Sequence, residues 1–271
     1  MIFDLHCHST SSDGSLTPQE LILHAKRLGL AGLAITDHDT QKAYEEAIPA
    51  AKEAGLFLGA GIELSCDFRD VPIHILGYDF DLWHPLLSDL IARHQKRREG
   101  RNRRILLKLQ EHKMPIAEEE LLQRGLSSTL GRPHIAELLV KKGYVATVRE
   151  AFQKYLGEGK LCYVRGETFS IEEAIGILHA AHGKVFLAHP HLLPKETPWD
   201  PLLDLPFDGI ECFYAKFTRA QSQRWIDIAY RKKWLMSGGS DFHGALAPKN
   251  PLGCNGVDLA TFNQIFQHNL Y

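Results

Sequence analysis

Imidazole and carboxylate side chains gather at the ends of short apolar runs in this 271-residue chain. Six of the seven strand-like runs contain such a side chain or are followed by one within a few residues. The candidates are His6, His8, Asp13, His38, Glu63, His74, His189, Asp241 and His243. A mixed histidine and carboxylate set suits Mn²⁺, Fe²⁺ or Zn²⁺, whereas Mg²⁺ and Ca²⁺ favour oxygen ligands alone. Because nine ligands exceed the needs of one ion, we expect two or three divalent ions, with Mn²⁺ preferred.

The spacing within several of these groups favours ligation. His6 and His8 stand two positions apart, so in a strand both imidazoles point to the same side. Glu63 closes an apolar run, and a carboxylate at a buried strand end needs a cation or a donor to offset its desolvation. Two alternatives stay open for single residues. Asp13 in Ser-Ser-Asp-Gly suits an ordinary turn, and His74 within an apolar run suits a core position.

Short apolar runs with β-branched residues indicate buried parallel strands. The seven runs are Ile2–Leu5, Leu33–Ile35, Leu56–Ile62, Ile73–Tyr78, Val185–Ala188, Gly209–Phe213 and Trp234–Ser237. Helices are expected between them, because Thr17 and Ser170 each precede a glutamate by three residues, as in a capping box. Alternating strands and helices predict an α/β barrel, in which the strand ends, and with them the candidate ligands, meet on one face.

The alternation is interrupted in the middle of the chain. Leu-rich, charged segments with helical spacing at Leu86–His112, Pro133–Lys142 and Thr147–Leu156 replace the strand-like runs. We therefore expect a discontinuous barrel domain of residues 1–80 and 166–271, with a helical insertion at 81–165 that covers the active site.

Composition excludes several other classes of protein. The formal net charge is −2, so any affinity for phosphate must be local. The five cysteines are scattered without a Cys-x-x-Cys pair, which disfavours a disulfide framework and a structural zinc site. No leader-like or membrane-spanning apolar stretch is apparent. These features favour a cytoplasmic protein with no membrane association and no obligate protein partner.

The ordered motifs resemble those of the PHP (polymerase and histidinol phosphatase) family. They are Asp4-Leu-His-Cys-His-Ser-Thr10, Thr36-Asp-His-Asp-Thr40, Gly61-Ile-Glu63, His189-Pro190 and Gly239-Ser-Asp-Phe-His-Gly244. The resemblance implies a distorted seven-stranded barrel with a trinuclear metal centre that hydrolyses phosphoesters. It also implies the ligands of each ion, with Glu63 as a bridge: His6, His8, Glu63 and Asp241 for the first, Glu63, His74 and His189 for the second, and Asp13, His38 and His243 for the third.

The insertion contains Leu130-Gly-Arg-Pro-His-Ile-Ala136, which resembles the phosphate-binding segment of nucleotide phosphatases and exoribonucleases in this family. The resemblance makes Arg132 and His134 candidates for substrate binding and catalysis, since a guanidinium can bind phosphate through two parallel hydrogen bonds. A helix that starts at Pro133 is the alternative. One departure is Phe217, which stands near a position where relatives often have histidine, so the substrate is less firmly implied than the chemistry.

A dense basic run in the insertion is a second candidate for substrate contact. Its members are Arg93, Lys96, Arg97, Arg98, Arg101, Arg103, Arg104 and Lys108. We predict that Arg98 and Arg101, together with Lys249 near the C-terminus, bind substrate phosphates. The alternative is a solvated helix face.

Three functions remain open at this stage. The first is hydrolysis of nucleotide or short RNA phosphates, in which a hydroxide held by the metals attacks phosphorus in line. The second is a histidinol-phosphate-type phosphatase, which needs no arginine-rich strip. The third is a catalytically silent PHP domain that serves as a binding module, and such a domain would be expected to lack some ligands.

Overall fold

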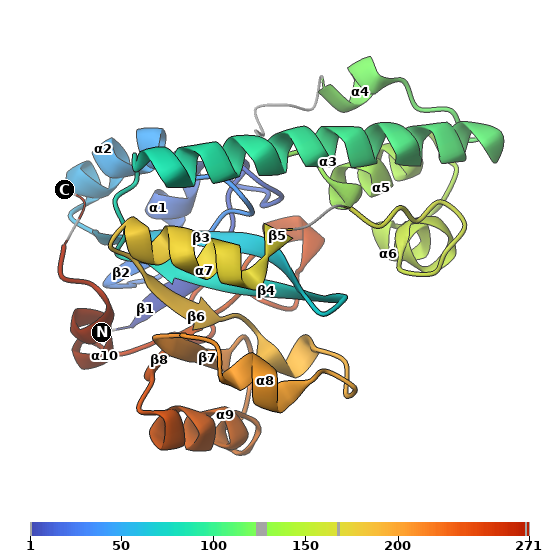
Figure 1. Cartoon of the computed structure of the whole chain (residues 1–271). Helices are drawn as coiled ribbons and strands as arrows, with labels where there is room; N and C mark the ends of the chain where they lie inside the picture. The colour runs from blue at the N-terminus through green and yellow to red at the C-terminus, as the bar shows by residue number, and fades with distance from the viewer. Residues whose placement is uncertain (1, 123–128, 167–168, 269, 271) are drawn as a thin grey trace.

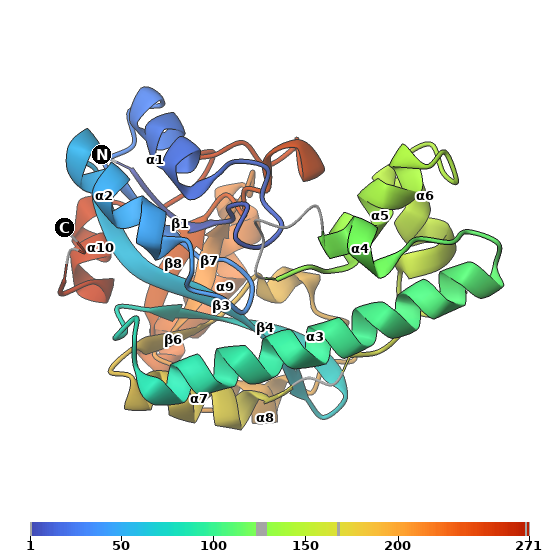
Figure 2. The same cartoon turned by 90° about the horizontal axis from the view of Figure 1, so that it is seen from above.

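The computed structural model describes residues 2–122, 129–166, 169–268 and 270. A sheet curls into a nearly closed barrel with helices packed around it, and a long helix, α3, carries a group of short helices to one side (Figures 1 and 2). The strands are β1 (Phe3–Cys7), β2 (Gly32–Ile35), β3 (Phe57–Phe68), β4 (Val71–Tyr78), β5 (Phe169–Ser170), β6 (Lys184–Leu187), β7 (Gly209–Tyr214) and β8 (Leu235–Gly239).

The strand order explains how both ends of the chain reach one site. The sheet runs β1-β2-β3-β4-β6-β7-β8, and β5 pairs with β3. Its two edges meet at the segments that follow β1 and β8: the His8 amide donates to the Phe242 carbonyl at 2.9 Å, and the Asp241 amide donates to the His6 carbonyl at 2.8 Å. Gly239 permits this approach, because a Cβ there would lie 2.4 Å from the His6 nitrogen.

The expectation of an all-parallel barrel was wrong for one strand. β4 pairs antiparallel with both β3 and β6, whereas the other pairings in the sheet are parallel. β3 runs on to Phe68, and the chain reverses through Arg69 and Asp70, whose φ angles are 50° and 69°. Two positive φ angles are typical of a tight hairpin turn, which usually carries Asn-Gly or Asp-Gly. Arg-Asp lacks that signature, so the hairpin was not foreseen.

Helices cover the outside of the barrel and build the adjoining layer. They are α1 (Pro18–Arg27), α2 (Tyr44–Ala54), α3 (Pro85–Glu111), α4 (Glu118–Leu122), α5 (Arg132–Lys141), α6 (Val148–Ala151), η1 (Phe152–Leu156), α7 (Ile171–Ala180), η2 (Pro190–Leu192), α8 (Trp199–Leu203), α9 (Arg219–Lys232), η3 (Gly244–Leu246) and α10 (Leu259–Ile265). The predicted helix starts are confirmed: Thr17 and Glu20 form a capping box, and Ser170 accepts a hydrogen bond from the Glu173 amide.

Helix α3 connects two hydrophobic cores. Leu87 and Leu90 near its start pack into the main core of the barrel. Ile105 and Leu109 near its end belong to a separate core that α5 and η1 complete. The expected insertion at 81–165 thus has a core of its own, although its first helix is anchored in the barrel. Its exact boundaries remain a prediction, and residues 123–128 within it lie outside the described residues.

A search of the described residues finds no helix with the length and apolar character needed to cross a membrane.

Candidate metal centre

Strand β1 and the residue that follows it place two imidazoles in the barrel. His6 and His8 are both fully buried, and their rings lie 5.3 Å apart between centroids. Cys7 lies between them in sequence and points elsewhere, since its thiol donates to the Ala34 carbonyl. The strand alternation expected from the spacing is therefore present.

Glu63 on β3 is the centre of the cluster. It is 1% exposed, and its two carboxylate oxygens lie 2.8–3.4 Å from five imidazoles. The five belong to His6, His8, His38, His74 and His189. They come from four strands, β1, β2, β4 and β6, or from the residues that follow them, so the barrel brings together groups that are up to 183 positions apart in sequence.

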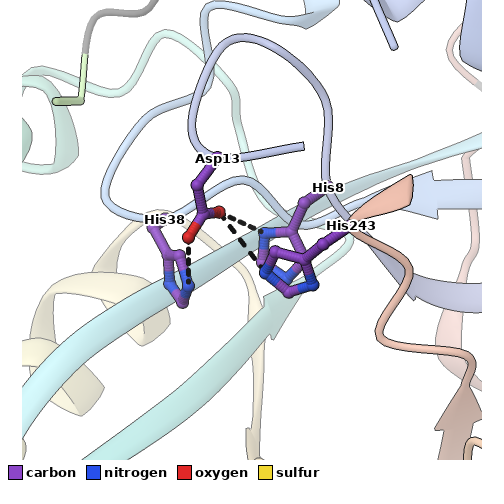
Figure 3. Close-up of side chains that lie close together, drawn as sticks. All are labelled: His8, Asp13, His38 and His243. Atoms are coloured by element: carbon purple, nitrogen blue, oxygen red, sulfur yellow. Dashed lines mark ion pairs between the residues drawn. The ribbon is translucent and has the colours of Figure 1, made fainter. Parts of the chain in front are cut away.

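A second carboxylate, that of Asp13, lies close to the imidazoles of His8, His38 and His243 (Figure 3). Its oxygens are 3.4 Å from His243 Nε2 and 3.8 Å from both His8 Nδ1 and His38 Nε2. Asp13 stands in the loop after β1, and that loop is held by Asp37, which accepts hydrogen bonds from the Ser9 amide at 2.7 Å and the Ser12 hydroxyl at 2.5 Å.

Asp241, which follows β8, completes the cluster from the C-terminal part of the chain. One of its oxygens is 3.3 Å from His6 Nε2 and 3.2 Å from His8 Nε2. The other accepts a hydrogen bond from the Tyr214 hydroxyl at 2.7 Å.

The structure therefore gathers all nine predicted ligands in one place. Three groups have ligand atoms within 4.8 Å of one another: His8, Asp13, His38 and His243; His6, His8 and Asp241; and His38, Glu63 and His74. These groups overlap the sets implied by the family resemblance without matching them one to one, because His8 joins the Asp13 group and His38 joins the Glu63 group. The division of ligands among individual ions remains a prediction.

Burial and mutual contact shift the pKa values in the cluster strongly. Burial opposes ionisation of the Glu63 carboxyl, but nearby His38 and His74 outweigh it and hold the pKa of Glu63 well below its ordinary value. Burial likewise lowers the pKa of His38 to about 3. His8 shifts in the opposite direction: burial disfavours its charged form, yet contacts with Asp241 and Glu63 raise its pKa to about 10.

The chemistry of this donor set fits divalent cations. His8 Nε2, Asp13 Oδ1 and His38 Nδ1 are buried and make no hydrogen bond among the described residues. Buried polar atoms are rarely left without a partner, and bound cations would supply partners for these three. It would also take the place of the proton that the carboxylates otherwise draw to His8. The cluster thus has the properties of a site for divalent metal ions.

Two further carboxylates accept hydrogen bonds from the predicted ligands or from their backbone. Neither was included in the ligand prediction. Glu211 on β7 accepts from His6 Nδ1 at 2.9 Å and from the His189 amide at 2.6 Å. Asp4 on β1 accepts from the amides of His6 and Ser240 at 3.2 Å and 3.0 Å. Both are at most 1% exposed. Asp4 stands in a recognised motif and Glu211 in a strand-like run, but nothing in their spacing indicated which ligand each would hold.

A pocket of about 270 Å³ opens next to the cluster, and arginines form one of its walls. The barrel lines it with Asp13, His38 and His74, and the helical layer lines it with Arg98, Arg101 and Arg132. The guanidinium groups of Arg98 and Arg101 converge on Gly131, where a Cβ would lie 3.4 Å from Arg98 Nη1 and 3.9 Å from Arg101 Nη2.

The arginines of this pocket differ in how well their charge is compensated. Arg98 donates to Asp39 and to the Ser65 hydroxyl, so it is held by a buried ion pair. Arg101 has a buried Nε without a hydrogen bond among the described residues. Burial, together with Arg98 and Arg132, lowers the pKa of Arg101 to about 9, so it remains charged at neutral pH. This charge is available for an anion.

The other predicted substrate residues lie in different environments. Arg132 lines the pocket and stands over the Tyr163 ring at 5.6 Å. His134 Nδ1 accepts a hydrogen bond from the Gly131 amide at the start of α5. The helix start that was the alternative for this segment is therefore present. A catalytic role for His134 remains a prediction. Lys249 is exposed and is not among the described residues that line the pocket. Phe217 lies 4.4 Å from the His191 ring, between centroids.

Comparison with known proteins agrees with the presence of a metal centre. A family model for the PHP domain matches residues 4–167. The chain belongs to the PHP family. The 5′-3′ exoribonuclease Rnm of Salmonella typhimurium is 36% identical over 254 residues, covering 90% of this chain and 85% of that protein. The 3′,5′-nucleoside bisphosphate phosphatase of Chromobacterium violaceum is 32% identical over 246 residues, covering 89% of this chain and 86% of that protein.

The PHP fold is also shared with a solved structure. A crystal structure of a candidate metal-dependent phosphoesterase from Bifidobacterium adolescentis superposes with a TM-score of 0.88. It is 33% identical in sequence, and the match covers 97% of this chain and 94% of that one. Because both chains are covered almost completely, the helical layer beside the barrel belongs to the shared architecture.

Proposed function

We propose that this PHP protein is a divalent-metal-dependent hydrolase of phosphate esters in short RNA and nucleotides. Its activity would be that of a 5′-3′ exoribonuclease, of a 3′,5′-nucleoside bisphosphate 3′-phosphatase, or of both. Mn²⁺ as the native metal and a cytoplasmic location are part of the proposal. The relatives named above act on such substrates according to their names.

One observation carries the proposal. The pocket that contains Asp13, His38 and His74 from the candidate metal centre also contains Arg98, Arg101 and Arg132. Buried guanidinium groups without enough carboxylates to neutralise them require an anion. Arginine matches the geometry of a phosphate through paired N–H donors. A phosphate ester held between the arginines and the metal ligands therefore suits this pocket better than a neutral substrate.

The residues of the chain have distinct parts in the proposed reaction. Divalent ions in such a site supply positive charge to the phosphoryl oxygens and activate water as a nucleophile. His6, His8, Glu63 and Asp241, with the other five predicted ligands, would hold them. Arg101 and Arg132 would bind the oxygens that face away from the ligands and fix the phosphorus for in-line attack. Phe152 and Tyr163 line the same pocket and would exclude bulk water from it.

Two alternatives are less well supported. A histidinol-phosphate-type phosphatase would share the ligands but has no need for several arginines in one pocket. A silent binding module would be expected to have lost some ligands, whereas all nine lie together in this chain.

A substrate comparison tests the proposal. The protein with added Mn²⁺ is given adenosine 3′,5′-bisphosphate, a short 5′-phosphorylated RNA, or histidinol phosphate, and released phosphate and mononucleotides are quantified. We expect turnover of the first two substrates. We also expect Arg132→Gln to raise KM about tenfold or more, because a charge-assisted hydrogen bond to phosphate is lost. Turnover of histidinol phosphate alone would support the phosphatase alternative, and no turnover of any substrate would support the silent module.

A further inference from the structure

The outward side of helix α3 has a basic surface that does not belong to the metal-centre pocket. A hollow of about 440 Å³ on this side is lined by Arg93, Lys96, Arg97, Gly100 and Arg104. We call the surface formed by these five residues the outer basic face. Helix α3 as a whole contains eight lysines and arginines against three acidic residues. Arg98 and Arg101 of the same helix line the metal-centre pocket instead. One helix thus presents basic side chains both to the metal centre and to the outside.

The charges of the outer basic face are only partly neutralised. Arg93 pairs with Asp89 and Glu173 at 2.9 Å and 2.8 Å. Lys96 and Arg104 are exposed and have no ion pair among the described residues. Among the residues that the structure describes, none with an acidic side chain lines the hollow. The face is therefore positive, in a protein whose formal net charge is −2.

Two features suggest that the face is shaped to receive a ligand. Gly100 lies in the interior of α3, and an added Cβ there would meet nothing within 4 Å. Glycine inside a helix lowers the stability of the helix by about 1 kcal/mol relative to alanine. At position 100 no neighbouring group would clash with a larger side chain. In addition, Arg93 and Arg97 lie over the Phe169 ring at 4.6 Å and 3.9 Å from its centroid. Arginine planes held in this way can stack against unpaired bases.

We infer that the outer basic face binds the single-stranded RNA that follows the phosphate held in the metal-centre pocket. This inference rests on the proposed function and adds a second binding surface to it. A helix with its side chains is about 10–12 Å across, so RNA must extend past the first nucleotide to reach the outer face from the pocket. A nucleoside bisphosphate would not touch this surface. Single strands are favoured over duplexes because only unpaired bases expose their faces to Arg93 and Arg97.

Binding without cleavage is the first test. A fluorescent 5′-phosphorylated RNA of about twelve nucleotides is titrated in EDTA by anisotropy, at several salt concentrations. We expect Lys96→Ala/Arg104→Ala to weaken binding about tenfold. We expect the slope of log K against log salt to fall by about 1.4, since each phosphate contact on a single strand contributes about 0.7. Gly100→Gln, which favours the helix but fills the hollow, should also weaken binding.

The matched control is Lys26→Ala/Arg27→Ala, which removes two exposed basic residues at the end of α1. Figure 2 shows α1 well separated from α3. An equal loss of binding in this control, or unchanged affinity and salt slope in Lys96→Ala/Arg104→Ala, would overturn the inference. Equally tight binding of duplex RNA would overturn its single-stranded form.

Kinetics distinguish this inference from the proposed function. With Mn²⁺ present, Lys96→Ala/Arg104→Ala should raise KM for the longer RNA about tenfold and leave kcat and KM for adenosine 3′,5′-bisphosphate unchanged. If the wild-type protein hydrolyses both substrates and the variant does so equally well, only the outer basic face has been misassigned. If the wild-type protein hydrolyses neither substrate, the proposed function itself is wrong.

Discussion

Asp13 is held less tightly by its neighbours than the other carboxylates of the centre. Glu63 has hydrogen bonds as short as 2.8 Å to imidazoles, whereas the closest imidazole nitrogen to Asp13 is 3.4 Å away. One of its oxygens makes no hydrogen bond among the described residues. Asp13 is therefore the predicted ligand whose loss should damage metal binding most and the fold least.

We expect Asp13→Asn to lower kcat at least a hundredfold, because the amide keeps the shape of the side chain but removes the charge that holds a cation. Circular dichroism and the thermal midpoint without metal should change little. Asp200→Asn, which removes an exposed carboxylate at the start of α8, is the control and should keep full activity. Unchanged turnover in Asp13→Asn would remove Asp13 from the centre.

Glu211 gives a second prediction at this scale, because it acts through other residues. Its carboxylate accepts hydrogen bonds from His6 Nδ1 and from the His189 amide, and Glu211 is not a predicted ligand. Groups that orient metal ligands in this way typically contribute 10–100-fold in metal affinity. Glu211→Gln should therefore raise the Mn²⁺ concentration that gives half-maximal activity by roughly that factor, while kcat at saturating Mn²⁺ recovers most of its value. A loss of kcat that Mn²⁺ does not restore would instead indicate direct participation in the reaction.

At the scale of elements, α3 is fastened to the barrel by a buried polar contact. Arg98 pairs with Asp39, and His94 one turn earlier lies 3.4 Å from the same carboxylate and 4.0 Å from the Phe169 ring centroid. Asp39 has φ of 52° and accepts from the Ser65 amide at 2.8 Å. The wall of arginines therefore depends on a contact with the residue next to His38.

Acid should loosen this contact through His94. Burial, with Arg98 and other nearby arginines, lowers the pKa of His94 to about 4 in the folded protein, although Asp39 acts in the opposite direction. The unfolded chain binds this proton near pH 6.5, so between pH 6.5 and 4 it holds more protons than the fold, and stability falls as pH falls. His94→Gln should remove at most about 3 kcal/mol of this pH dependence. Urea unfolding at pH 7 and pH 4.5 gives the free energy of unfolding of the wild-type protein and of His94→Gln. An equal loss of this free energy at pH 4.5 in the two proteins would contradict the assignment to His94.

The success of sequence analysis also differs between elements. The meeting of nine ligands was predictable because strand ends of an α/β barrel converge whatever the details of the loops. The direction of β4 was not, because a buried antiparallel strand has the same apolar run as a parallel one, and the turn at Arg69 and Asp70 lacks glycine. The supporting roles of Asp4 and Glu211 depend on side-chain register across strands far apart in sequence. Lys249 was proposed without a pattern to place it.

At the scale of the whole molecule, metal ions should stabilise the fold. The centre draws its predicted ligands from both edges of the barrel sheet, and several of their buried polar atoms make no hydrogen bond among the described residues. A ligand that binds only the folded state adds about 2.7 kcal/mol at a hundred times its Kd. For a chain of this size, we expect saturating Mn²⁺ to raise Tm by roughly 5–10 °C over the EDTA-treated protein. Scanning calorimetry measures the shift, which should shrink in Asp13→Asn. An unchanged Tm would contradict metal binding by the folded centre.

The meeting of β1 with the residues after β8 has a consequence for synthesis of the protein. Asp241 and His243 are made more than 230 residues after His6. The main-chain contacts that close the barrel, such as that between His8 and Phe242, can form only then. A growing chain therefore has an incomplete centre until the residues after β8 have been made. If the proposed function is correct, the protein would in this way be unable to hydrolyse its own messenger or ribosomal RNA while it is still attached to the ribosome.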